Sequence, residues 1–289
     1  MDEVVYLNGQ LIPRSQATIS VADYGFLYGY GLFETMRAYE GGVFLLEKHL
    51  RRLSASAEIL GLPIKTLDLK DAVVRTIRAN RLASARVRIA ISSGEGEVNA
   101  NPGTCKSPTV LILAQEYKPY SESVYDKGFR AVVSSIHRNS GSSLSRLKSA
   151  SYLESIMARQ EARRNGADEA ICLNEKGFLA EGSMSNIFIV TGGLLRTPGR
   201  DSGILAGITR ETVIEIASQL SLPTAEHDIR QDELFAAEEA FLTNSLIEVM
   251  PLTEIDNRQI GSGKPGAVTR ALLKAYRELV QQTLKGRTI

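Results

Sequence analysis

Apolar residues recur at helical spacing in several segments of the chain. The clearest segment is 47–60, where Leu50, Leu53 and Leu60 fall on one face and Gly61 provides a stop. Helices are also expected over 67–81, 150–165, 209–220 and 267–284.

Short apolar runs bounded by turn residues predict strands between these helices. The first two strands are expected within 4–13, on either side of the turn formed by Asn8 and Gly9. Further strands are expected at 33–39, 43–46, 86–92, 109–114, 129–135, 170–173, 177–179, 187–190, 239–243 and 249–252.

Strands and helices mix without a strict alternation, which predicts mixed sheets in an α/β (α+β) fold of two domains. A polar, tyrosine-rich stretch at 117–126 is the candidate linker. The expected organisation is therefore a small N-terminal domain over 1–116 and a larger C-terminal domain over 127–289.

Composition narrows the functional classes. Hydrophobic residues make up 43% and charged residues 23% of the 289 residues, as in an ordinary globular enzyme. The 34 basic and 33 acidic residues balance, so no nucleic-acid or membrane partner is expected. The start Met1-Asp2-Glu3 does not resemble a secretory signal, and neither of the two cysteines has a CxxC partner. A reducing cytoplasm is the expected location.

Lys148 and Glu181 are the candidates for chemistry, the second at the head of the run Glu181-Gly182-Ser183-Met184-Ser185-Asn186. A lysine can form a Schiff base with an aldehyde cofactor, and a carboxylate can keep the ring nitrogen of pyridoxal phosphate (PLP) protonated. On local sequence alone, a lysine such as Lys148 is more often a solvated surface charge, and Glu181 is equally well an exposed turn carboxylate.

Two further segments suit a phosphate group. Arg52, in His49-Leu50-Arg51-Arg52-Leu53, can grip a phosphate with two parallel hydrogen bonds, although paired arginines are more often a solvated helix face. Gly207-Ile208-Thr209 precedes a predicted helix, and the N–H groups at a helix start bind anions.

Other motifs are weaker. The run 261–266 lacks the spacing of a phosphate-binding loop and contains Pro265, so it is interpreted as a turn. The three histidines are scattered, and no metal site is expected. Ser183 and Ser185 have no neighbouring His, which disfavours a serine hydrolase.

The stretch LKSASYLESIMARQEARRNGADEAICLNEKGFLAEGSMSNIFIV, followed by GILAGITR, resembles the class IV aminotransferases, which are fold-type IV PLP enzymes. The resemblance covers nearly the whole chain. It implies two α/β domains, PLP as the cofactor, and a homodimer whose active sites take residues from both subunits. The family includes branched-chain and D-amino acid aminotransferases, (R)-amine transaminases and 4-amino-4-deoxychorismate lyases.

The resemblance also implies roles for individual residues. Lys148 would be the Schiff-base lysine, Glu181 the partner of the pyridine nitrogen and Arg52 a phosphate ligand. The implied cofactor-binding residues are Arg52, Lys148, Glu181, Ser185, Asn186, Ile208, Thr209 and Ser245. The implied substrate-binding residues are Tyr28, Phe33, Thr35, Arg88 and Leu246.

The substrate residues point in two directions. Phe33 and Arg88 fit the branched-chain pattern, whereas Thr35 and the Thr243-Asn244-Ser245-Leu246 run are similar to the lyases. Tyr152 lies one residue away from the position of a cofactor-facing tyrosine in branched-chain enzymes. The expected activity is a transaminase that moves an amino group from an amino acid or primary amine to a 2-oxo acid. The alternatives are a lyase releasing pyruvate and 4-aminobenzoate, and a non-catalytic relative.

Overall fold

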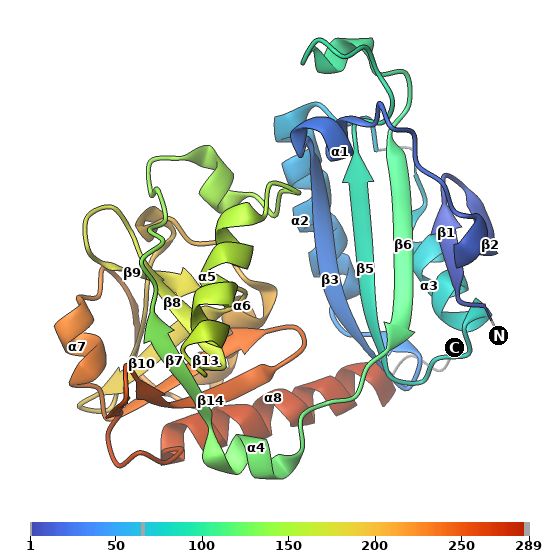
Figure 1. The fold of residues 1–289 in the computed structure, drawn as a ribbon. Helices are drawn as coiled ribbons and strands as arrows, with labels where there is room; N and C mark the ends of the chain where they lie inside the picture. The colour runs from blue at the N-terminus through green and yellow to red at the C-terminus, as the bar shows by residue number, and fades with distance from the viewer. Residues whose placement is uncertain (1, 65–66, 286–289) are drawn as a thin grey trace. The chain divides into compact units, whose positions relative to one another are not determined.

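A computed structural model of the protein describes residues 2–64 and 67–285 (Figure 1). The chain divides into two compact units. Unit 1 comprises Met1–Lys118, Leu147–Ser151 and Thr283–Ile289, and unit 2 comprises Pro119–Arg146 and Tyr152–Gln282.

Within its described residues, unit 1 is built on an antiparallel six-stranded sheet in the order β2-β1-β6-β5-β3-β4. The strands are β1 (Val4–Leu7), β2 (Gln10–Pro13), β3 (Gly31–Tyr39), β4 (Gly42–Val43), β5 (Ala85–Ser92) and β6 (Thr109–Glu116). The predicted turn at Asn8-Gly9 is confirmed, because both residues take positive φ between β1 and β2.

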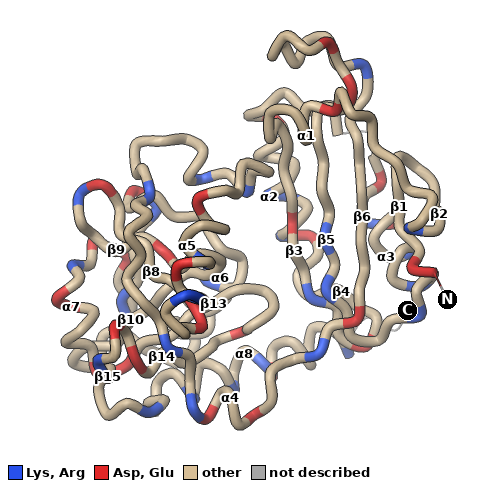
Figure 2. The backbone as a smooth tube through the Cα atoms, in the orientation of Figure 1, with Lys and Arg blue, Asp and Glu red and all other residues tan. Residues whose placement is uncertain are grey.

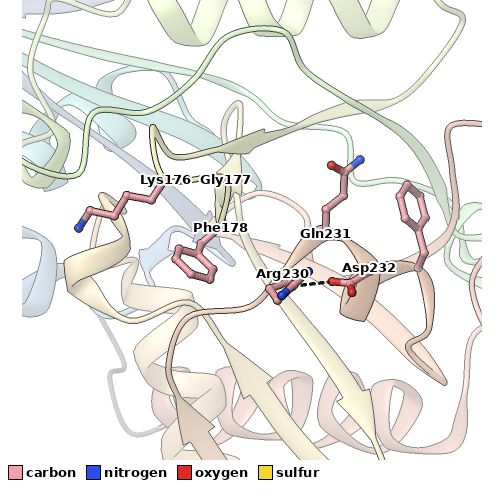
Figure 3. Close-up of a pocket in the computed structure, with 7 residues that line it drawn as sticks. Lys176, Gly177, Phe178, Arg230, Gln231 and Asp232 are labelled. Carbon is pink, nitrogen blue, oxygen red and sulfur yellow. Dashed lines mark hydrogen bonds and ion pairs between the residues drawn. The ribbon is translucent and has the colours of Figure 1, made fainter.

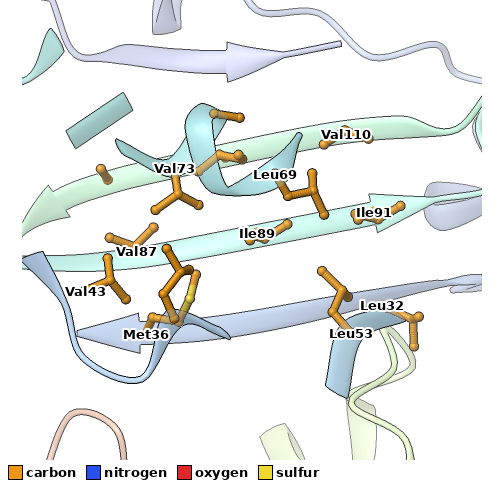
Figure 4. Packing of buried hydrophobic residues seen from close by; sticks show 14 of the residues in the cluster. Leu32, Met36, Val43, Leu53, Leu69, Val73, Val87, Ile89, Ile91 and Val110 are labelled. Atoms are coloured by element: carbon orange, nitrogen blue, oxygen red, sulfur yellow. The ribbon is translucent and has the colours of Figure 1, made fainter. Parts of the chain in front are cut away.

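Two helices pack on one face of this sheet, α2 (Leu46–Leu60) and α3 (Leu69–Ala79). Strand alternation decides which residues of β3 meet them: Leu32, Met36 and Ala38 point into the shared apolar core (Figure 4). Glu34 is in phase with these three residues and is fully buried. The odd-numbered residues, Phe33 among them, face the other side of the sheet.

The segment Leu147–Ser151 belongs to unit 1 although the chain on either side of it belongs to unit 2. Its backbone bonds to β3: the Phe33 N–H donates to the Lys148 carbonyl at 2.9 Å, and the Ala150 N–H donates to the Gly31 carbonyl at 2.8 Å. The prediction of a helix from residue 150 is wrong at its start, since helix α5 begins at Leu153. Lys148 is therefore held by a strand edge and not by a helix.

Unit 2 contains, among its described residues, a mixed nine-stranded sheet in the order β12-β11-β10-β13-β14-β7-β8-β9, with β15 paired to β14. The pairs β7–β8, β7–β14 and β11–β12 are parallel and the other pairs are antiparallel. The strands are β7 (Phe129–Val133), β8 (Glu169–Leu173), β9 (Leu179–Gly182), β10 (Asn186–Thr191), β11 (Leu194–Thr197), β12 (Thr224–Glu226), β13 (Glu239–Asn244), β14 (Glu248–Ile255) and β15 (Arg258–Gln259).

The central strands of unit 2 are buried on both faces, which explains their continuous apolar runs. Phe188 of β10 stacks on its cross-strand partner Phe241 of β13, with ring centroids 4.9 Å apart. Ala158 and Ala162 of α5 pack on Ala170 and Cys172 of β8, and these small side chains let the helix lie close to the sheet.

The remaining helices frame these sheets. They are α1 (Tyr24–Tyr28) in unit 1 and α4 (Glu122–Lys127), α5 (Leu153–Arg164), α6 (Ile208–Gln219), α7 (Gln231–Phe235) and most of α8 (Ala267–Lys285) in unit 2. Short 3₁₀ turns occupy Arg14–Gln16, Pro102–Thr104, Ser143–Arg146 and Arg200–Ser202.

The mixed α/β fold expected from the sequence is confirmed, with local corrections. Helix α4 occupies part of the stretch expected to be an irregular linker. The strand expected at 177–179 lies at Leu179–Gly182, so Glu181 is part of a strand and not of a turn. The strand expected at 43–46 ends at Val43, because α2 begins at Leu46.

Charged residues of both signs are interspersed along both units (Figure 2), in keeping with the net charge of +1. Among the described residues, no helix combines the length and apolar character needed to cross a bilayer.

Candidate functional site

Lys148 lies over an aromatic ring in unit 1. Its Nζ is 4.6 Å from the ring centroid of Phe33, and Cζ of Arg88 is 3.9 Å from the same centroid. Arg88 reaches this ring because it pairs with Thr35 across the β3–β5 ladder, two residues from Phe33 on the same face. Lys148 and Arg88 thus both lie close to the Phe33 ring, and Thr35 is the cross-strand partner of Arg88.

Arg52 is anchored by an acidic residue that the sequence analysis did not single out. Nε and Nη2 of Arg52 donate to the two carboxylate oxygens of Glu34, each at 2.7 Å. Nδ1 of His49 lies 2.7 Å from Oε2 of the same carboxylate. His49 and Arg52 are three residues apart on α2, so both side chains lie on the helix face that meets β3.

The protonation states of this group follow from its surroundings. Burial alone would raise the pKa of Glu34, but the Arg52 charge and the hydrogen bonds from His49 and Arg52 lower it to about 2. Burial lowers the pKa of His49 in spite of Glu34. Neutral His49 therefore carries its proton on Nδ1 and donates it to ionised Glu34.

Tyr28 is another of the predicted substrate residues in unit 1. It lies on α1, 40% exposed, with its ring edge-on to Tyr24 at 4.8 Å. Its hydroxyl accepts a hydrogen bond from the backbone of Ala100 at 3.3 Å.

Glu181 is buried in unit 2, where backbone and side-chain groups hold its carboxylate. Oε2 accepts the Leu205 N–H at 3.0 Å and the Asn186 side-chain amide at 3.4 Å. Oε1 lies 3.5 Å from Nε of Arg138. Although burial would lower the pKa of Arg138, the Glu181 charge raises it, so Arg138 stays charged.

A second buried carboxylate, Glu169, organises the turn that follows Glu181. It accepts hydrogen bonds from the hydroxyls of Ser183 and Ser185, the latter at 2.9 Å, and Nη1 of Arg159 lies 3.3 Å away. The Ser185 hydroxyl therefore points at Glu169, and its role toward a cofactor stays a prediction. Gly182 is required here, because a Cβ would lie 2.2 Å from Oγ of Ser185.

The start of α6 presents backbone donors. Gly207 precedes the helix, and no side chain among the described residues caps it. The first N–H groups of a helix have no partner within the helix, so those of Ile208 and Thr209 are available to an anion. A Cβ on Gly207 would lie 2.0 Å from Oδ1 of Asn186, so glycine lets Asn186 link Glu181 to this helix start.

Ser245 and Leu246 lie in the turn between β13 and β14. Oδ1 of Asn244 accepts the backbone N–H groups of Leu246 and Ile247, each at 2.9 Å, which fixes the turn. Nδ2 of Asn244 donates to the Met184 carbonyl at 3.0 Å, so this turn lies beside the turn after Glu181. The neighbouring Thr243 hydroxyl is buried without a hydrogen-bond partner among the described residues.

Tyr152 lies at the start of α5, with its hydroxyl 3.4 Å from the Ser183 carbonyl. Burial and the nearby Glu181 charge raise its pKa, so it stays protonated. The structure thus brings Tyr152 into the neighbourhood of Glu181 within unit 2.

The donor sets fit the parts of PLP. In unit 2, a buried carboxylate suits a protonated pyridine nitrogen and the uncapped start of α6 suits a phosphate dianion. In unit 1, Lys148 supplies an amine for the aldehyde and Arg52 a guanidinium for the phosphate.

A separate pocket on unit 2 contains none of the predicted site residues. It is lined by Lys176, Gly177, Phe178, Arg230, Gln231, Asp232 and Phe235 (Figure 3). An exposed Arg230–Asp232 ion pair at 3.1 Å forms part of its lining. Across 2–64 and 67–285, no three His, Cys, Asp or Glu side chains gather as a metal site requires.

Sequence reasoning missed Glu34, Arg138 and Glu169. Glu34 could have been found from the sequence, because it alternates in phase with Leu32 and Met36. A charged residue at such a core position needs buried partners. Arg138 and Glu169 could not have been found in this way, because their partners lie far along the chain and are brought close only by the fold of unit 2.

The chain is similar to known proteins over most of its length. The family model described as "Amino-transferase class IV" matches residues 31–255. The putative branched-chain-amino-acid aminotransferase of Methanocaldococcus jannaschii is 37% identical over 95% of this chain and 96% of its own. The aminodeoxychorismate lyase of Bacillus subtilis is 35% identical over 97% of this chain and 96% of its own.

A solved structure supports the same grouping. A branched-chain amino acid aminotransferase from T.th., solved with pyridoxamine 5'-phosphate, superposes with a TM-score of 0.93 at 33% identity, over 98% of this chain and 95% of its own. The family match covers most of the chain, and the relatives are similar over nearly their full lengths. The chain therefore belongs to the class IV aminotransferase family of PLP-dependent enzymes.

Proposed function

We propose that this chain is a transaminase that transfers the amino group of branched-chain amino acids to 2-oxo acids. The observation that carries the proposal is the grouping of Lys148 and Arg88 on the Phe33 ring. It supplies an amine for chemistry and a cation for a substrate carboxylate beside an apolar surface. The branched-chain aminotransferases among the relatives support the substrate class.

The chain's own residues divide the work. PLP supplies an aldehyde and an electron-withdrawing ring that stabilises negative charge developing at the substrate Cα. With PLP bound, Lys148 would hold the aldehyde, and as a free amine it would take up the proton from the substrate Cα. Glu181 would hold the proton on the ring nitrogen, and Arg138 keeps Glu181 in place.

Phosphate binding is proposed for Arg52, the start of α6 and Ser245. Arg52 carries a fixed charge, and Ile208 and Thr209 add backbone donors. Asn186 would stabilise this arrangement, because its side-chain amide donates both to Glu181 and to the Leu205 carbonyl.

Substrate recognition is proposed for Phe33, Thr35, Arg88, Tyr28 and Leu246. Arg88 is the candidate partner of the substrate carboxylate, because a guanidinium matches a carboxylate with two hydrogen bonds. Phe33 offers the apolar surface that a branched side chain needs.

A homodimer in the cytoplasm completes the proposal. Large apolar residues stand exposed on both units, among them Val21 at 82%, Phe26 at 77% and Leu153 at 68%, as expected of a surface that a second subunit covers. Both cysteines are free thiols, which suits a reducing compartment.

A 4-amino-4-deoxychorismate lyase is the second candidate. It is favoured by the 35% identity to the Bacillus subtilis lyase and by Thr35 beside the Arg88 position.

One substrate panel tests both candidates. The purified chain with PLP is incubated with leucine, valine and isoleucine, each as both enantiomers, and with 2-oxoglutarate, and glutamate is measured. Aminodeoxychorismate is offered in parallel and 4-aminobenzoate is measured. Glutamate formation supports the transaminase, whereas 4-aminobenzoate without any glutamate overturns it in favour of the lyase.

A further inference from the structure

The carboxylate of Glu34 occupies a position in the fold where burying a charge is energetically unfavourable. It is 0% exposed, on the face of β3 that packs into the apolar core of unit 1. A buried carboxylate costs several kilocalories per mole of desolvation unless partners compensate it. An apolar residue at this point of the alternation would fit the core without that cost.

The partners of Glu34 are arranged to orient one side chain. Both carboxylate oxygens accept from Arg52, one from Nε and one from Nη2, at 2.7 Å each. This paired geometry fixes the plane of the guanidinium as well as its position. His49 binds Oε2 at 2.7 Å and so holds the carboxylate from the α2 side.

The Arg52 side chain keeps 17% of its surface exposed, whereas the side chains of Glu34 and His49 keep 1% and 3%. The group is therefore layered, with a buried acid and a buried imidazole behind a cation that reaches the surface. Buried partners of this kind fix the orientation of a ligand-binding cation and limit its rotamers before the ligand binds.

We propose that Glu34 is the positioning residue that orients Arg52 for the phosphate group of the cofactor, with His49 holding Glu34 in turn. The inference rests on the proposed function, because it takes Arg52 as a phosphate ligand. Because Glu34 is fully buried, it acts through Arg52 and is not itself proposed as a ligand.

A purely structural ion pair would behave differently from a positioning pair. Loss of a structural pair would weaken the binding of any ligand that needs unit 1 to be folded. Loss of the orientation of Arg52 weakens the binding only of ligands that carry the phosphate. PLP and phosphate-free pyridoxal share the aldehyde and the ring, so the ratio of their affinities isolates the phosphate contribution.

The experiment titrates the full-length chain, cleared of cofactor, with PLP and separately with pyridoxal, and follows the absorbance of the lysine-bound chromophore. Glu34→Gln keeps the shape of the side chain but replaces one acceptor oxygen with a donor. Glu34→Asp keeps the charge but shortens the side chain by one methylene. This variant replaces Glu34→Gln in the titration if Glu34→Gln folds poorly. Glu47→Gln removes a carboxylate from an exposed ion pair with Lys70 on the neighbouring helix α3. Val73→Ala weakens the core of unit 1 without touching Arg52.

Glu34→Gln is expected to weaken PLP binding about 10- to 100-fold, the equivalent of one hydrogen bond to a charged group. Pyridoxal binding is expected to change by no more than about twofold, and the controls to leave the ratio unchanged. In an Arg52→Met background, Glu34→Gln should no longer alter the ratio. Equal losses of PLP and pyridoxal affinity, or no loss of either, would overturn the role of Glu34. A wild-type chain that binds neither compound would overturn the proposed function itself.

Discussion

Glu34→Gln should also change how the folding stability of the chain depends on pH. The pKa of Glu34 falls from an ordinary 4.5 to about 2 in the folded chain. Ionised Glu34 therefore stabilises the fold above pH 4.5, and this contribution disappears as the pH falls from 4.5 toward 2. Each tenfold change in proton affinity corresponds to about 1.4 kcal/mol, so the contribution at neutral pH is roughly 3 kcal/mol.

The measurement is urea-induced unfolding of the cofactor-free chain between pH 7 and pH 3. Circular dichroism is the suitable signal, because the chain contains no Trp. The pKa of His49 is lowered in the folded chain, so protonation of His49 also destabilises the fold as the pH falls below 6.5. Because Glu34 acts on the pKa of His49, wild type and variant are compared in the range below pH 4.5, where Glu34 itself titrates. Glu47→Gln is the matched control, since its carboxylate is half exposed in a surface pair.

The free energies of unfolding of wild type and Glu34→Gln should converge as the solution is acidified. Most of the convergence should fall below pH 4.5, where Glu34 begins to take up a proton in the unfolded wild-type chain. Two curves that stay parallel down to pH 3 would refute the assignment of the buried charge to Glu34.

Three further substitutions test other parts of the site. Lys148→Ala should abolish covalent attachment of PLP, seen by mass spectrometry after borohydride reduction; a reduced adduct elsewhere in the chain would contradict the lysine assignment. Gly207→Ala should cost about 1–3 kcal/mol of unfolding free energy, because its Cβ would lie 2.0 Å from Oδ1 of Asn186. Gly199→Ala, whose Cβ would meet nothing within 4 Å, should be neutral in the same urea titration. Glu169→Gln should lower the melting temperature by removing one acceptor from its two serine donors; an unchanged melting temperature would show that the cluster does not stabilise the turn.

Local patterns predicted most helices and strands, because periodicity reports which face of an element is buried. The helix expected over 47–60 and the strand expected over 86–92 differ from α2 and β5 by one residue at one end. The segment around Lys148 was placed wrongly, because its conformation is set by hydrogen bonds to β3, more than 100 residues earlier. Helical spacing after residue 150 gave no sign of that distant strand edge.

Only those residues of the candidate site that lie in recognisable motifs could be predicted from the sequence. Lys148, Glu181 and Arg52 stood out by residue type and by resemblance, whereas their supporting partners did not. Arg138 reaches Glu181 across 43 positions of chain, and only the folded sheet brings the two together. Support of this kind depends on tertiary contacts, which a single sequence does not display.

The insertion of Leu147–Ser151 along β3 has a consequence for the synthesis of the chain. Until residue 151 has left the ribosome, the Gly31–Phe33 edge of β3 lacks the carbonyl and N–H partners that this segment provides, since β4 pairs with Ala38 and Tyr39 at the other end of the strand. An unpaired strand edge is a template for association with other chains. The first 118 residues are thus an incomplete folding unit that carries an open edge, and the nascent chain must protect that edge until the segment bearing Lys148 arrives.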